Sequence, residues 1–109
     1  METQKIRTVA GREMVFDAED FLMDPDDWGE EVALELARES GIPELTDLQW
    51  QVIRFLRKYY LENGRAPLNR QIKSGTGLSL MEIENLFPGG IKQGARRLAG
   101  LPNPRSCGS

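Results

Sequence analysis

The clearest structural signal in this chain is the run Leu45-Thr-Asp-Leu-Gln-Trp-Gln-Val-Ile-Arg-Phe-Leu-Arg-Lys-Tyr-Tyr-Leu-Glu-Asn-Gly64. It opens with the capping box Thr46-x-x-Gln49, and Leu45 precedes the cap, opposite Trp50, as in a hydrophobic staple. Apolar residues then recur at steps of three and four, and Gly64 is a typical C-terminal stop. We therefore predict a helix over 46–63 that forms the spine of the core. Its apolar stripe is expected to pack inward rather than stack on nucleic-acid bases, and it comprises Val52, Ile53, Leu56, Tyr59 and Tyr60.

A β-hairpin and a helix are predicted before this spine. β-Branched and aromatic residues flank Ala10-Gly11-Arg12, which predicts a hairpin over residues 4–16 with Gly11 in the turn. Asp24-Pro25 is a strong helix start, because the aspartate can cap free amides and proline fits the first helical position. This helix is expected to span 25–40 and to bury a stripe of Trp28, Val32, Ala33, Leu36 and Ala37.

Three short helices are predicted after the spine. Helices over 69–74 and 79–87 flank the turn Gly75-Thr76-Gly77, and the second opens with the capping box Ser79-x-x-Glu82. This pair suggests a helix-turn-helix. A last helix over 91–99 stops at Gly100, and two prolines keep residues 101–109 extended as an arm. The expected fold class is mainly α, a small helical bundle with an N-terminal β-hairpin, a helix-turn-helix and an extended C-terminal arm, in which residues 1–100 form one domain.

Length and composition fit one domain of a cytoplasmic protein. The chain has 109 residues, with 39% hydrophobic and 28% charged residues, which is typical of a soluble globular protein. No apolar run approaches the ~20 residues that a membrane-spanning helix needs. The first residues resemble neither a secretory signal nor a transit peptide, so the cytoplasm is the expected compartment.

The residue types restrict the chemistry more sharply than the fold. The sequence has no histidine and one cysteine, Cys107, which excludes His-Cys zinc sites, Ser-His-Asp and Cys-His pairs and an internal disulfide. No phosphate loop or dinucleotide fingerprint is present either, and we predict neither a cofactor nor a metal. Covalent chemistry must therefore use Cys107. On the extended arm it is either a reactive thiol, its pKa lowered by Arg105, or an accidental surface thiol.

Charge is divided unevenly along the chain. Residues 1–63 hold 7 Lys/Arg and 15 Asp/Glu, net −8, whereas residues 64–109 hold 7 and 2, net +5. The basic cluster of Arg96 and Arg97, with Lys92 and Arg105, is either a solvated helix face or a contact for tRNA or an acidic protein.

Several blocks of the sequence resemble the DsrC/TusE family. They lie in the family's order along nearly the whole chain and read Asp20-Phe-Leu-x-Asp24, Trp28-x-Glu-Glu-Val32, Leu45-Thr46, Trp50-x-Val-Ile-x-Phe-Leu-Arg-x-Tyr-Tyr60, Ala66-Pro67, Leu86-Phe-Pro-x-Gly90 and Ala99-Gly-Leu-Pro-x-Pro-x-x-Cys107. The resemblance implies a small helical fold with a hairpin, a helix-turn-helix and a mobile arm that ends in the cysteine.

The resemblance also implies a role in sulfur transfer. Relatives that act with dissimilatory sulfite reductase carry a second cysteine eleven positions before the terminal one, and here that position is Arg96. The chain therefore resembles the single-cysteine TusE type, a sulfurtransferase that takes a persulfide from a TusBCD-like donor and passes it to an MnmA-like thiolase, towards 2-thiolation of the tRNA wobble uridine. In that scheme Cys107 is the carrier, Arg105 a thiolate stabiliser, and Arg96 and Arg97 are further supporting residues. Gly108 and Ser109 form a small tip, and Pro102 and Pro104 stiffen the arm.

Two other functions stay open. The first is an accessory gamma subunit that docks its arm on a sulfite-reductase-type enzyme. The second is a DNA-binding regulator built on the helix-turn-helix, although its second helix offers Glu82 and Glu84, which phosphate repels, and only Asn85 for contact with bases.

Overall fold

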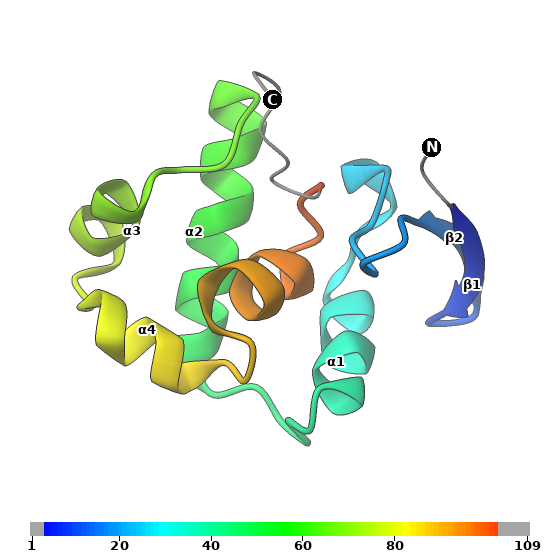
Figure 1. Ribbon diagram of the computed structural model, residues 1–109, viewed down its shortest axis with the longest axis horizontal. Coiled ribbons are helices and arrows are strands. Elements are labelled where there is room, and N and C mark those ends of the chain that lie inside the picture. The colour runs from blue at the N-terminus through cyan, green and yellow to red at the C-terminus, as the bar shows by residue number, and fades with distance from the viewer. Residues whose placement is uncertain (1–3, 103–109) are drawn as a thin grey trace.

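The computed structural model describes residues 4–102, except for the side chains of Lys92 and Gln93. The fold consists of one long helix, α2, a set of shorter helices packed around it, and a two-stranded hairpin at the edge of the molecule (Figure 1). The elements are β1 (Lys5–Val9), β2 (Arg12–Phe16), the 3-10 turn η1 (Pro25–Asp27), α1 (Glu30–Glu39), α2 (Asp47–Asn63), α3 (Asn69–Thr76), α4 (Leu80–Leu86) and the π-helical segment η2 (Gly90–Arg96). The predicted mainly helical class with an N-terminal hairpin is confirmed.

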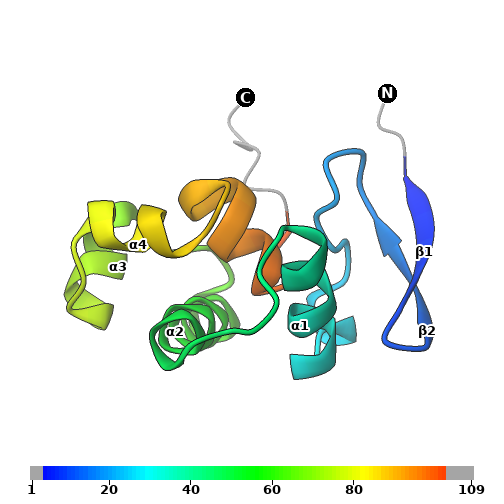
Figure 2. The same ribbon diagram turned by 90° about the horizontal axis from the view of Figure 1, so that it is seen from below.

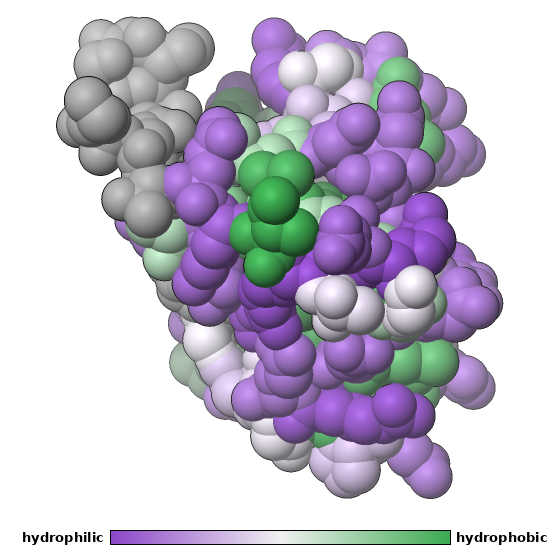
Figure 3. Space-filling model, turned by 90° about the vertical axis from the view of Figure 1, so that its right-hand side faces the viewer, coloured by the Kyte–Doolittle hydropathy of each residue, from purple (hydrophilic) through white to green (hydrophobic). Residues whose placement is uncertain are grey.

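The hairpin lies beside α1, at one end of the molecule (Figures 1 and 2). Its strands are antiparallel, with Val9 opposite Arg12, and the two-residue turn Ala10-Gly11 has φ values of 53° and 79°. Positive φ at both turn residues is the geometry of a type I′ hairpin, whose twist matches the strands. Figure 3 faces this side and shows a small hydrophobic area among hydrophilic residues; Ile6 and Val15, which are cross-strand partners, are the exposed large hydrophobic side chains of the two strands.

The predicted continuous helix over 25–40 is wrong in its first turn. Asp24 caps η1 by accepting a hydrogen bond from Asp26 N at 3.0 Å, but Trp28 and Gly29 then adopt extended backbone and α1 begins at Glu30. The side chain of Trp28 donates to Leu98 O at 2.8 Å, a contact 70 positions away in the chain. A tertiary contact therefore overrides the local helix signal. The rest of the predicted stripe is buried: Val32, Ala33, Leu36 and Ala37.

Helix α2 matches its prediction closely. Thr46 Oγ1 accepts from Gln49 N at 3.2 Å and Gln49 Oε1 accepts from Thr46 N at 2.8 Å, so the capping box is formed. Gly64 ends the helix with φ 75°. Val52, Ile53 and Leu56 are fully buried in the main core cluster, whereas Tyr59 and Tyr60 are half-buried.

Two short helices do follow, but the predicted glycine turn is partly helical. Gly75 and Thr76 belong to α3, and only Gly77 (φ 76°) leaves it. Gly75 is needed where it stands, because a Cβ there would lie 2.2 Å from the Phe55 ring of α2. Helix α4 begins after the predicted Ser79–Glu82 capping box, which is formed.

The last helix differs most from its prediction. Instead of an α-helix over 91–99, η2 is π-helical and is followed by a single helical turn that ends at Gly100. Gly94 allows the backbone to pass Phe87, where a Cβ would lie 2.7 Å from the phenylalanine Cβ. This segment lies over α2 and between α1 and α4 in both views (Figures 1 and 2), with Ala95, Leu98 and Ala99 in the core. Within residues 4–102, no helix has the length and apolar character required to cross a membrane.

Candidate functional site

The predicted carrier, Cys107, lies outside the described residues, as do Arg105, Pro104, Gly108 and Ser109. What the structure describes of the site is its foundation, the segment from Leu98 to Pro102, which we call the arm root. Every residue of the arm root except Pro102 is buried, and Pro102 is half-buried. The residues directly before the predicted arm, and its first residue Leu101, are therefore packed into the core.

The backbone changes direction at Gly100. Its φ is 73°, a conformation that favours glycine, and its N–H donates to Arg97 O at 3.1 Å. The next N–H, of Leu101, donates to Arg96 O at 3.2 Å, and the Leu101 side chain is fully buried. These bonds close the last helical turn, so the first residue of the predicted arm is held by the core.

Two side chains from distant parts of the chain hold this turn. Trp28 Nε1 donates to Leu98 O at 2.8 Å, and Arg57 Nη1 donates to Ala99 O at 2.9 Å. Arg57 also donates through Nη2 to Pro25 O at 3.2 Å, and its guanidinium lies 4.2 Å from the centre of the Trp28 ring. Burial lowers the pKa of Arg57 below its ordinary value, with the Asp26 charge acting in the opposite direction. The pair therefore combines hydrogen bonding with a cation–π contact.

Arg96 points away from this pair. Its Nη2 donates to Pro67 O at 3.0 Å, and its buried Nε has no hydrogen-bond partner among the described residues. Burial lowers the pKa of Arg96. The side chain also borders an open hollow of about 380 Å³ lined by Asn69, Glu84, Gly89, Gly90 and Ile91.

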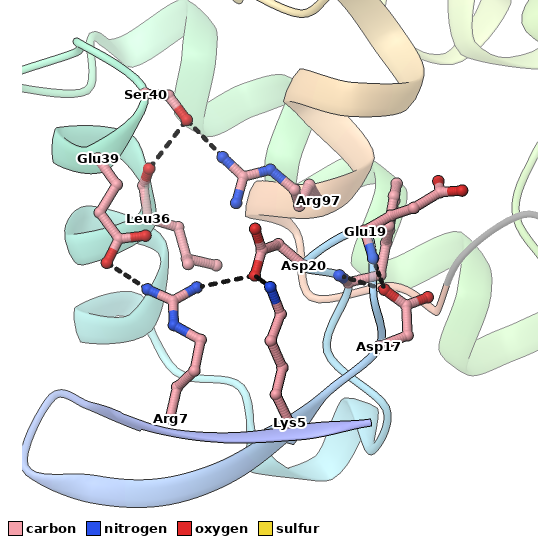
Figure 4. Close-up of polar contacts among 10 residues, drawn as sticks. Lys5, Arg7, Asp17, Glu19, Asp20, Leu36, Glu39, Ser40 and Arg97 are labelled. Atoms are coloured by element: carbon pink, nitrogen blue, oxygen red, sulfur yellow. Dashed lines mark hydrogen bonds and ion pairs between the residues drawn. The ribbon is translucent and has the colours of Figure 1, made fainter. Parts of the chain in front are cut away.

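Arg97 points to the other side, towards α1 and the hairpin. It donates to Ser40 Oγ, which in turn donates to Leu36 O at 3.0 Å (Figure 4). Burial lowers its pKa, and the nearby charges of Asp20 and Glu39 act against that shift. The same view shows Lys5 and Arg7 reaching Asp20 from β1, with Lys5 Nζ 2.9 Å from Asp20 Oδ1.

The structure thus separates two residues that the sequence grouped. Arg96 and Arg97 are half-buried and bonded to different parts of the chain, which does not fit the first of the two interpretations given for this cluster, a solvated helix face. Their role beside Cys107 stays a prediction. The sequence also did not single out Arg57 or link Trp28 to the arm, because their bonds to the arm root span 42 and 70 positions.

The exposed side of α4, the second helix of the predicted helix-turn-helix, is acidic where a DNA reader would be basic. Met81, Glu82, Glu84 and Asn85 are the exposed residues of α4, and Glu82 is engaged in its capping box. The described residues also contain no group of three carboxylate or thiol side chains placed to hold a metal ion.

Comparison with known proteins identifies the family. A family model described as DsrC like protein matches residues 8–108, nearly the whole chain. The chain belongs to the DsrC/TusE family. The match to this family extends past the described arm root and includes Cys107.

Named members of the DsrC/TusE family resemble the chain to a similar degree. The dissimilatory-type sulfite reductase subunit gamma of Nitratidesulfovibrio vulgaris is 37% identical over 92% of this chain and 95% of its own length. The sulfurtransferase TusE of Photorhabdus laumondii is 36% identical over 89% and 93%. Among solved structures, the oxidized gamma subunit (DsrC) from Archaeoglobus fulgidus superimposes with a TM-score of 0.81 at 38% identity, covering 94% of this chain and 99% of that one.

Proposed function

We propose that this protein is a sulfur carrier that holds one sulfur atom as a persulfide on Cys107 and passes it to an acceptor in the cytoplasm, as TusE-type sulfurtransferases do. The proposal rests on the position of one reactive group, the Cys107 thiol. The 109-residue sequence holds a single cysteine, it lies inside the family match, and it stands six residues (107 − 101) beyond the buried Leu101.

The chemistry needs no oxidant or reductant. The Cys107 thiolate attacks the outer sulfur of a donor persulfide, a new S–S bond forms, and the donor's inner sulfur leaves as a thiolate. In the second step an acceptor thiolate attacks the outer sulfur now on Cys107, which leaves as a thiolate in turn. Arg105, two residues before the cysteine, favours the thiolate form by its charge.

The residue at position 96 favours a carrier over a two-thiol redox partner. Family members that act with dissimilatory sulfite reductase carry a second cysteine eleven positions before the terminal one, and Arg96 stands there in this chain. A second thiol would attack the persulfide and release its sulfur. Without one, the cargo on Cys107 persists until an acceptor arrives.

A gamma-subunit role is the second candidate, because a relative with that name is 37% identical over nearly its full length. In that role the arm docks on a sulfite-reductase-type complex. Partners of the carrier role are a TusBCD-like donor and an MnmA-like thiolase, and contact with tRNA is indirect.

Intact mass spectrometry tests the carrier proposal. Wild-type protein incubated with glutathione persulfide is expected to gain the mass of one sulfur atom and to lose it on treatment with dithiothreitol. Cys107→Ser is the control and is expected to gain none. A wild type that gains no sulfur, or a Cys107→Ser protein that gains the same mass, contradicts the proposal.

A further inference from the structure

We propose that Trp28 and Arg57 act together as a clamp that positions the arm for sulfur transfer between proteins. The inference rests on the carrier function proposed above and deepens it. Both are positioning residues, since they contact the arm root rather than the sulfur.

The clamp holds the two carbonyls that a helix end leaves without partners. The last carbonyls of a helix have no N–H ahead of them and need another donor. Trp28 supplies one for Leu98 O at 2.8 Å and Arg57 supplies one for Ala99 O at 2.9 Å. Arg57 belongs to α2, and Trp28 follows η1, so the arm root is tied to two elements that are themselves packed on the core.

The clamp also fixes the direction in which the chain leaves. Gly100 lies against the Trp28 ring so closely that a Cβ would be 2.3 Å from Cδ1. Arg57 stacks on that ring at 4.2 Å and bonds Pro25 O at 3.2 Å, so the ring is held by the guanidinium. With both carbonyls bonded and the ring in contact with Gly100, the arm root has one place and one orientation.

A fixed root matters because the arm is short. Six residues span at most about 20 Å when fully extended, so Cys107 can explore only a limited volume around Leu101. Holding the start of the arm in one orientation fixes the point from which the span to Cys107 begins, and we expect this to raise the effective concentration of the thiol at a docked partner. Transfer from a small donor in solution does not require the arm root to be held in place.

Helix α2 offers a matched control one turn before Arg57. Arg54 also lies over a tryptophan, Trp50, at 5.1 Å, and it also bonds an oxygen, Glu30 Oε2 at 3.1 Å. Arg54 is exposed, and its contacts with Trp50 and Glu30 lie away from the arm root. Arg54→Gln therefore removes the same kinds of contact without touching the clamp.

The position of the arm is measured first, on the full chain. A nitroxide attached to Cys107, the one cysteine in the sequence, broadens the amide signals of the surface that the arm visits. We expect a localised pattern in the wild type and in Arg54→Gln, and a pattern spread over more of the surface in Trp28→Phe and Arg57→Gln. Trp28→Phe keeps an aromatic side chain but loses the indole N–H and its hydrogen bond to Leu98 O, so it serves as the test if Arg57→Gln does not fold.

Sulfur uptake is measured second, with two donors. For Trp28→Phe and Arg57→Gln we expect uptake from glutathione persulfide within twofold of wild type, and uptake from a cysteine desulfurase charged with L-cysteine at least tenfold slower. A general loss of structure would slow both. Arg54→Gln is expected to match wild type with both donors.

Three results overturn the clamp. They are an unchanged broadening pattern in both clamp variants, a protein-donor rate that does not fall, and rates that fall equally with the two donors. If the wild type takes sulfur from neither donor, the carrier function itself is overturned. If the wild type takes no sulfur from one of the donors, the clamp is tested by the broadening pattern alone.

Discussion

At the scale of single residues, Gly100 is the most constrained position of the arm root. A Gly100→Ala substitution combines strain at φ 73° with overlap between the new Cβ and Trp28, 2.3 Å away. We expect it to lower the free energy of unfolding by about 2–4 kcal/mol, of which ~1 kcal/mol comes from the backbone and the rest from overpacking. Chemical denaturation followed by circular dichroism measures this loss.

Gly64 provides the comparison for that measurement. Its φ is 75°, almost the same as at Gly100, but a Cβ there would meet no heavy atom within 4 Å. Gly64→Ala is therefore expected to cost only about 1 kcal/mol. Equal losses in the two variants would mean that the contact with Trp28 contributes nothing.

Residue types alone led to a prediction of the chemistry of the site, but not of the contacts that hold the arm root. A sequence without histidine and with one cysteine favours Cys107 as the nucleophile whatever the fold, and this assignment stays a prediction. The clamp could not be predicted in this way. The sequence places Trp28 in the apolar stripe of a helix and Arg57 in a block shared with the family, and neither pattern points to the carbonyls that they bond, at positions 98 and 99.

At the scale of elements, Gln49 joins the start of α2 to the end of α4. Its Oε1 completes the capping box, and its Nε2 donates to Leu86 O. Gln49→Glu keeps the acceptor but loses the donor and sets a carboxylate against a carbonyl. We expect it to cost about 1–3 kcal/mol of stability at neutral pH. The loss should shrink on acidification, because a protonated carboxyl can donate again; thermal unfolding at two pH values checks this.

The second capping box supplies the control for that prediction. Glu82 has the same role at the start of α4, but it is exposed and its carboxylate bonds Ser79 N at 2.8 Å. Glu82→Gln keeps this acceptor, so stability is expected to change by no more than about 0.5 kcal/mol. A cost at Glu82 as large as at Gln49 would contradict the assigned role of the Leu86 contact.

The elements that were predicted well are those whose signals are local. Capping boxes at Thr46 and Ser79 lie within four residues, and both are formed. The errors arise where packing partners are remote. Trp28, predicted to be helical, lies before the start of α1 and bonds Leu98, and Gly75 belongs to α3, where the adjacent space is filled by Phe55 of α2.

At the scale of the whole molecule, the division of charge along the sequence does not turn the two described arginines at the end of η2, Arg96 and Arg97, into an exposed basic face. Residues 64–109 carry net +5, but Arg96 and Arg97 turn inward to Pro67 and Ser40. The terminal segment lies between α1 and α4 (Figure 1), and its two arginines bond Ser40 at the end of α1 and Pro67 in the connection between α2 and α3. The net charges of the two parts of the sequence show that charge is divided unevenly along the chain, but they do not predict where the side chains of Arg96 and Arg97 point.

Delivery of sulfur by Cys107 is tested most directly by the product of the proposed relay. The chromosomal copy is replaced by Cys107→Ser, and 2-thiouridine at the tRNA wobble position is quantified by nucleoside mass spectrometry, with Arg54→Gln as the control. We expect 2-thiouridine to fall to the level of a deletion strain in Cys107→Ser and to remain normal in Arg54→Gln. Unchanged 2-thiouridine in the Cys107→Ser strain would contradict the account.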